Sequence, residues 1–182
     1  MVVAIKEKDR IVAAYFPHHE SLEETMIDPL HEENLPIRIF DDKIVLFCNG
    51  GVGADCLLYD DELWQGEITP ARLLKEVIPI IKSRGKQYGF FGEGYWGNAL
   101  VVLQDGRLMR IDPFFRVSEI SDFLCHGRQP NYVNGTLLAT KGEPAEQRIL
   151  KATRLYGKAF RIAIEKVAVV DDQQRKINLM EV

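Results

Sequence analysis

The chain begins with MVVAIKEKDRIVAAY, residues 1–15, and this stretch decides the fold class. It contains two short apolar runs rich in β-branched residues, 2–5 and 11–15, on either side of the charged residues 6–10. Two such runs around a short polar segment are typical of paired strands. The sequence therefore predicts that the fold starts with a strand pair and not with a helix.

Working outward from this pair, the chain alternates between groups of strands and groups of helices. Pro17, Pro29 and Pro36 interrupt a polar stretch, which predicts a loop over residues 16–36. Asp41-Asp42 is a turn between two further apolar runs, and Asp105-Gly106 is the strongest hairpin turn of the chain. Periodicity and end signals predict strands at 37–40, 43–48, 99–103, 108–111, near 122–125 and at 162–170, and helices at 54–66, 69–85, 131–140 and 144–160. Such grouped runs favour an α+β fold with separate sheet and helix layers.

The second predicted helix has the clearest boundaries. Thr69 is a good N-cap and Pro70 occupies the first helical position. An apolar stripe follows at helical spacing, and we expect the helix to end before Gly85. Pro79 should kink it or end it earlier, because proline removes one helical hydrogen bond.

Composition limits the classes of function. With 182 residues, 46% of them hydrophobic, residues 1–182 are predicted to form one domain with its own core. The net charge of −4 does not indicate a surface that binds nucleic acid or an anionic membrane. Cys48, Cys56 and Cys125 fit neither paired disulfides nor a zinc site. Charges stand where a signal peptide would be apolar, so we expect a cytoplasmic protein.

The order of these segments resembles that of the β-type proteasome subunits and of the bacterial proteasome-like protease of the heat-shock locus. These are N-terminal-nucleophile hydrolases. The opening strand pair, the segment RIFDDKIV at 38–45 with Asn49-Gly50-Gly51 after it, the hairpin over 99–111 and the helix over 146–160 carry the resemblance. It covers nearly the whole chain and implies a four-layer αββα sandwich.

The resemblance also implies a narrow chemistry. In that family a threonine at the mature N-terminus attacks a peptide carbonyl, and its own amine is the general base. Here Met1 and Val2 occupy that position, and neither has a nucleophilic atom. The other charged or polar positions of the family's site align with apolar or different residues: Phe16 or Pro17 for an aspartate, Leu35 for a lysine, residues 126–129 for a Gly-Ser-Gly turn and Lys158 for a second aspartate. Only Gly50 and Gly51 persist as an oxyanion-hole remnant.

Three hypotheses follow. The first is a non-catalytic proteasome-like subunit, without cofactor or metal, that acts by homo-oligomerisation, for example in a ring, or by binding a peptide. The second is an active peptidase or amidohydrolase whose nucleophile is relocated or freed by cleavage before Ser21, Thr25 or Cys48. The third is a separate domain that binds a small ligand near Gly50 and Gly51.

Other stretches have both a functional and a structural interpretation. His18, His19, Glu20 and His31 are metal-ligand types, but a solvated polar loop explains them as well. Cys125 beside His126 could suggest a nucleophile pair, whereas strand neighbours point to opposite faces, which favours a buried cysteine and a half-exposed histidine. Residues 88–97 form either an adhesive surface or an aromatic bend, with five aromatic residues: Tyr88, Phe90, Phe91, Tyr95 and Trp96.

Overall fold

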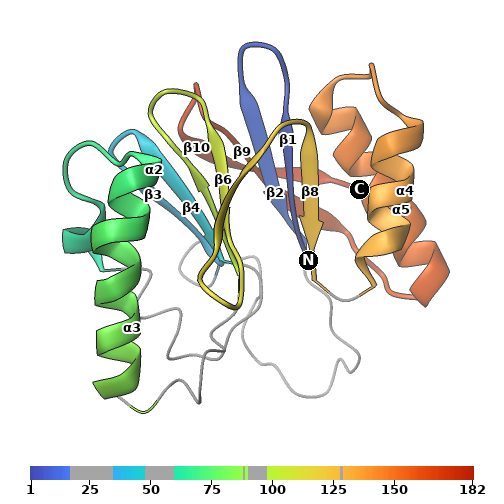
Figure 1. The fold of residues 1–182 in the computed structure, drawn as a ribbon. Coiled ribbons are helices and arrows are strands. Elements are labelled where there is room, and N and C mark those ends of the chain that lie inside the picture. Colours follow the sequence, from blue (N-terminus) through green and yellow to red (C-terminus); the bar gives the residue numbers. More distant parts are fainter. Residues whose placement is uncertain (17–34, 48–59, 88, 90–97, 128) are drawn as a thin grey trace. The chain divides into compact units, whose positions relative to one another are not determined.

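The computed structural model begins with the predicted hairpin (Figure 1). It describes residues 1–16, 35–47, 60–87, 89, 98–127 and 129–182. Two compact units divide the chain: Met1–Leu35 with Asp122–Val182, and Pro36–Ser121. Each unit contains one antiparallel sheet and its own helices. That residues 1–182 act as a single domain stays a prediction.

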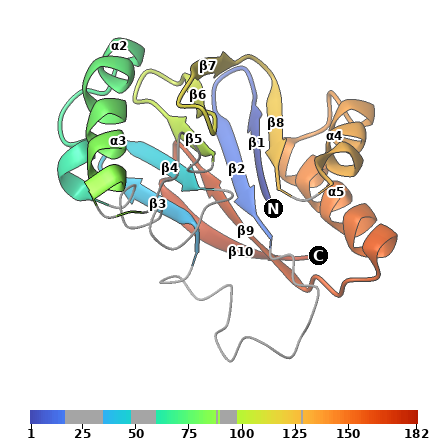
Figure 2. The ribbon, with the colours of Figure 1, turned by 60° about the horizontal axis from the view of Figure 1, so that its bottom comes forward.

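The first unit has a five-stranded sheet in the order β10-β9-β2-β1-β8. Two helices, α4 (Pro130–Ala139) and α5 (Ala145–Phe160), pack together against one face of this sheet (Figures 1 and 2). The strands are β1 (Val2–Lys6), β2 (Ile11–Tyr15), β8 (Phe123–His126), β9 (Lys166–Asp171) and β10 (Lys176–Glu181).

Alternation along β1 and β2 fixes which side chains meet these helices. Val3, Ile5, Val12 and Ala14 lie in one buried cluster with apolar side chains of α4 and α5. The residues between them in β1 and β2 are also fully or almost fully buried up to position 14, so both faces of these strands are apolar. A continuous apolar run, instead of an apolar and polar alternation, is the sequence signal of a strand covered on both faces.

The second unit has a five-stranded sheet in the order β3-β4-β5-β6-β7. The sheet and the helical segment of the unit share one apolar cluster, which includes Trp64, Leu73, Ile81 and Val101. The strands are β3 (Ile37–Phe40), β4 (Lys43–Phe47), β5 (Ala99–Val102), β6 (Leu108–Ile111) and β7 (Val117–Ile120).

The predicted helix over 69–85 forms, but it runs further than expected. Thr69 accepts a hydrogen bond from the Arg72 N–H and so acts as the N-cap. The helix consists of α2 (Pro70–Arg72), a π-helical turn η3 (Leu73–Val77) and α3 (Ile78–Gln87). The prediction that it ends before Gly85 was wrong. Pro79 does not end it either: the wider π-helical turn ends at Val77, two residues before the proline, and such turns accommodate a missing hydrogen bond.

Four other elements differ from the sequence prediction. The last predicted strand, 162–170, starts only at Lys166, because α5 is followed by Arg161 in a left-handed conformation and a connecting segment. Strands β7 and β10 were not predicted, since both carry exposed polar residues. Of the predicted helix over 54–66, the described part contains only the 3₁₀ turn η2 (Asp61–Trp64).

Candidate functional site

Met1, which the sequence analysis placed at the expected nucleophile position, directly precedes β1 in the structure. The α-amine of Met1 donates a hydrogen bond to the Phe16 carbonyl oxygen over 3.0 Å. The Phe16 N–H donates to the Met1 carbonyl oxygen over 3.1 Å. These two bonds extend the pairing of β1 with β2 by one residue and place both residues inside the first unit.

The Met1 side chain packs against Cys125 and Gly127 and belongs to the apolar cluster that includes α4 and α5. We call this contact region the Met1 seat. The Met1 Sδ is 3.1 Å from the Cys125 Sγ, which donates the contact's hydrogen bond. Gly127 forms the other wall: a Cβ there would stand 2.9 Å from Met1 Sδ and 3.1 Å from Met1 Cα. Gly127 also has φ +142°, which side chains rarely adopt. Only glycine leaves room for Met1 at this position.

Cys125 is the one thiol among the described residues, and it is buried. Burial raises the pKa of this thiol to about 12, although the positive charge of the nearby terminal amine acts in the opposite direction. The thiol is therefore protonated at neutral pH. His126, the next residue, is half-buried, as predicted for neighbours on one strand.

Aromatic packing continues from this seat into the core. Phe16 makes an edge contact with Tyr156, with ring centroids 5.7 Å apart. Tyr156 in turn contacts Phe160 at 4.6 Å. Phe16, Tyr156 and Leu35 are each almost completely removed from solvent. Apolar side chains thus fill positions that the family resemblance assigns to a site's aspartate and lysine, while Lys158 is exposed on α5.

Several other predicted site residues lie outside the described residues. These are Gly50 and Gly51, the proposed metal ligands around His18 and His31, and the five aromatic residues of the stretch 88–97. Within residues 1–16, 35–47, 60–87, 89, 98–127 and 129–182, no three His, Cys, Asp or Glu side chains are grouped in a way that could hold a metal ion. The described helices include none with the length and apolar character needed to cross a bilayer.

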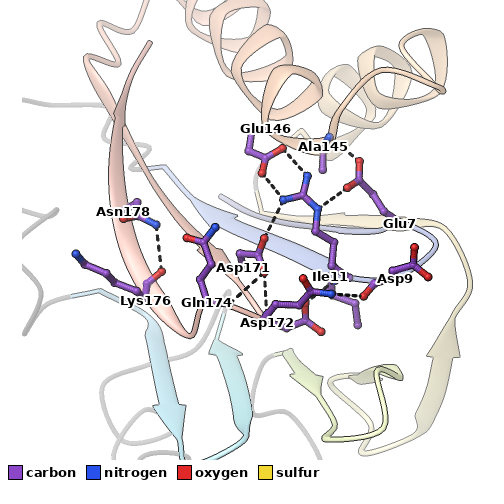
Figure 3. A network of polar contacts seen from close by, with 12 residues as sticks. Glu7, Asp9, Ile11, Ala145, Glu146, Asp171, Asp172, Gln174, Lys176 and Asn178 are labelled. Carbon is purple, nitrogen blue, oxygen red and sulfur yellow. Dashed lines mark hydrogen bonds and ion pairs between the residues drawn. The ribbon is translucent and has the colours of Figure 1, made fainter.

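A polar network around Arg10 lies at the opposite end of β1 (Figure 3). The Arg10 guanidinium contacts the carboxylates of Glu7, Glu146 and Asp171 at 2.7 to 3.0 Å. Its pKa is raised, mainly by the hydrogen bonds with Glu146 and against the effect of burial. Glu7 also accepts a hydrogen bond from the Ala145 N–H at the start of α5.

This network holds three distant segments together: the β1–β2 turn, the start of α5 and the end of β9. The sequence analysis missed it. The only local signal was the i,i+3 pair Glu7 and Arg10 inside the predicted turn. We assign it a structural role, because Arg10 pairs with three carboxylates of the first unit and the Asp171 side chain is almost fully buried.

The comparisons with known proteins point to one fold. No protein-family model and no curated protein sequence matches the chain. Among solved structures, Thiobacillus denitrificans BPH in complex with Epoxomicin superposes with a TM-score of 0.71 at 15% identity, covering 99% of this chain and 97% of that one. The fold is of the proteasome type.

Two further structures support this assignment. Eukaryotic HslV from Trypanosoma brucei gives a TM-score of 0.61 at 15% identity, covering 93% of this chain and 97% of that one. Anbu (ancestral beta-subunit) from Yersinia bercovieri gives 0.62 at 13% identity, covering 98% and 81%. The predicted fold class, α+β of the proteasome-like N-terminal-nucleophile type, is confirmed. At these identities the likeness concerns the fold and leaves the chemistry to be argued from the site.

Proposed function

We propose that the chain is a proteasome-like subunit without N-terminal-nucleophile catalysis, which acts by self-association or by binding a peptide. One observation carries this proposal. The Met1 side chain is packed against Cys125 and Gly127, at the position where a catalytic residue would present its hydroxyl or thiol. A thioether has no proton to give up and is not an acyl acceptor in this chemistry.

The chemistry of the surrounding groups supports the same conclusion. Acyl transfer needs a nucleophile beside a general base. The thiol next to the Met1 amine is that of Cys125, and burial raises its pKa to about 12, so the thiol stays protonated at neutral pH. The amine itself donates its hydrogen bond to the Phe16 carbonyl.

The apolar replacements add a second line of support. Phe16 and Leu35 are buried and can neither hold a charge nor orient a nucleophile. Rebuilding a charged site there would need carboxylate and ammonium groups in a volume now filled by aromatic packing, and an unpaired buried charge is costly.

Assembly and peptide binding remain as roles that do not need a nucleophile. The similar Yersinia bercovieri structure is named as a subunit, and the Thiobacillus denitrificans structure holds Epoxomicin. We propose that this chain forms a homo-oligomer, with a ring as the specific form to test, and that it works in the cytoplasm. Native mass spectrometry of the purified chain gives the number of copies directly, and a monomer at micromolar concentration would contradict this part.

The alternative function is an amidohydrolase with a relocated nucleophile. A single contact favours it: the terminal amine lies close enough to Cys125 to lower the pKa of the thiol. Burial outweighs this effect, so we rank the alternative second. It predicts an activity that depends on Cys125.

Intact-mass spectrometry together with a peptidase assay tests the proposal. The expected mass corresponds to a first residue of Met1 or Val2, with no turnover of fluorogenic peptides and no covalent adduct after incubation with Epoxomicin. A mass that begins at Ser21 or Thr25, or an adduct, would overturn the proposal. Cys125→Ala is the matched variant, because activity that is present in the wild type and lost in this variant would establish the relocated nucleophile.

A further inference from the structure

The turn between β6 and β7 holds an aromatic ring and a guanidinium in solvent. Phe114 is 67% exposed, and the Arg116 side chain is 76% exposed. The Arg116 guanidinium carbon lies 5.5 Å from the centroid of the Phe114 ring, within the range of a cation–π contact. A large exposed aromatic side chain in contact with an arginine is the composition of a protein-binding hot spot more than of an ordinary turn.

Asp112 holds this turn in one conformation. Its Oδ1 accepts hydrogen bonds from the Phe114 N–H at 2.8 Å and the Arg116 N–H at 3.0 Å. Its Oδ2 accepts from the Arg116 Nε at 2.7 Å. Burial acts to raise the pKa of Asp112, but the hydrogen bonds from Arg116 and Phe114 outweigh it and lower the pKa. The carboxylate is therefore charged at neutral pH, and Phe114 and Arg116 are presented without a large loss of entropy on binding.

Phe115 anchors the turn to the apolar cluster of the second unit. It adopts φ +62° and is only 6% exposed, within the apolar cluster of that unit. The Lys82 Nζ lies 4.8 Å from the centroid of its ring. The neighbouring Phe114 side chain, by contrast, is largely exposed to solvent. One phenylalanine thus anchors the turn while the other is left for contact.

Asp112 pairs with the Arg116 guanidinium through Nε alone, so the positive charge at this turn is only partly compensated within the described part of the chain. Arg116 uses its Nε for Asp112, and its two terminal nitrogens have no hydrogen-bond acceptor among the described residues. Lys82 forms no ion pair with any of these residues. Two cations beside aromatic rings therefore mark a basic and apolar spot on a chain whose net charge is −4.

We propose that this turn binds an acidic segment of a partner protein, with a carboxylate on the Arg116 guanidinium and an apolar side chain on the Phe114 ring. The fork of N–H groups on arginine matches a carboxylate, and the pairing is strengthened when both oxygens are bound. Two cations are too few for the phosphate contacts that give nucleic-acid binding its affinity. The inference does not depend on whether the chain cleaves peptides.

Fluorescence anisotropy with the full chain tests this. The probe is a fluorescein-labelled hexapeptide of alternating Glu and Leu, and its matched control alternates Gln and Leu. The Glu peptide should bind more tightly, and Phe114→Ala or Arg116→Gln should each weaken its binding roughly tenfold. Arg107→Gln, at the exposed β5–β6 turn, and Leu138→Ala, an exposed apolar residue of α4, should leave it unchanged.

Four outcomes would overturn the proposal. One is the absence of Glu-peptide binding at millimolar protein, and another is equal binding of the Glu and Gln peptides. A third is tighter binding of a single-stranded oligonucleotide than of the Glu peptide. The fourth is a change of oligomeric state in Phe114→Ala or Arg116→Gln, seen by analytical ultracentrifugation, which would assign the turn to a contact between copies of this chain. Peptide binding lost only in the two turn variants, with the oligomer unchanged, supports the proposal.

Discussion

Gly127 packs directly against Met1 in the first unit, and a Cβ added to Gly127 would stand 2.9 Å from Met1 Sδ and 3.1 Å from Met1 Cα. The sulfur is at a flexible position and can move, but the Cα belongs to the backbone of the strand pair. The glycine and the methionine are thus fitted to each other. The fold accepts a bulky apolar residue at the start of β1 because the opposite wall has no side chain.

The first prediction concerns Gly127→Ala. It should lower the free energy of unfolding by about 2–4 kcal/mol, because positive φ strain and overpacking against Met1 add together. Gly142→Ala is the matched control, since Gly142 has φ +102° but nothing within 4 Å of an added Cβ. Urea unfolding of both variants separates the two effects. If both variants lose the same free energy, the contact with Met1 contributes nothing.

The second prediction is a pH dependence caused by Cys125. The pKa of its thiol is raised from 9.0 to about 12 in the folded chain, so the unfolded chain releases this proton first as the pH rises. The folded state should therefore lose stability above pH 9, through the range up to 12. Cys125→Ala should show a weaker loss across this range.

Alkylation gives an independent measurement of the same thiol. Iodoacetamide at neutral pH should leave Cys125 unmodified in the folded chain and modify it in urea, as read by peptide mass mapping. Rapid modification of Cys125 in the native chain would mean that the thiol is accessible and ionised, which contradicts the buried seat beside Met1.

The third prediction concerns Arg10, which contacts Glu7, Glu146 and Asp171. Arg10→Met should lower the free energy of unfolding by about 2 kcal/mol, because the Asp171 side chain is only 8% exposed and would lose its cationic partner. Arg107→Met, in an exposed pair with Asp105, should leave it essentially unchanged, because solvent screens such a pair. Thermal unfolding at low and high salt checks both, and equal shifts would show that the Arg10 network is an ordinary surface pair.

The comparison of Arg10 with β1 shows what the sequence could predict. The apolar runs 2–5 and 11–15 predict the hairpin because strand periodicity is local, and Thr69-Pro70 predicts a helix start because caps are local. The partners of Arg10 stand 136 and 161 positions away in the chain. No periodicity connects residues that far apart, so the network could not be found before the fold was known.

The same difference between local signals and distant contacts explains what could be predicted at Met1 and at strand β10. That the Met1 side chain has no hydroxyl or thiol can be read from the sequence, but its packing against Cys125 and Gly127 depends on the pairing of β1 with β8. Strand β10 escaped prediction because it is an edge strand with mixed exposed residues, including Leu179. Strand β10 therefore lacks the continuous apolar run that identified β1, because most of its side chains are exposed or only partly buried.

The fourth prediction compares two phenylalanines. Phe16 is fully buried and contacts Tyr156, so Phe16→Ala should lower the free energy of unfolding by about 3–5 kcal/mol. Phe114→Ala removes a side chain that is 67% exposed and should change it by less than about 1 kcal/mol. Urea unfolding of both variants provides the measurement. A large loss in Phe114→Ala would show that its ring stabilises the fold, and the ring would then not be reserved for a partner. A small loss in Phe16→Ala would contradict the apolar filling of the position at the end of β2, and with it the second line of support for the absence of catalysis.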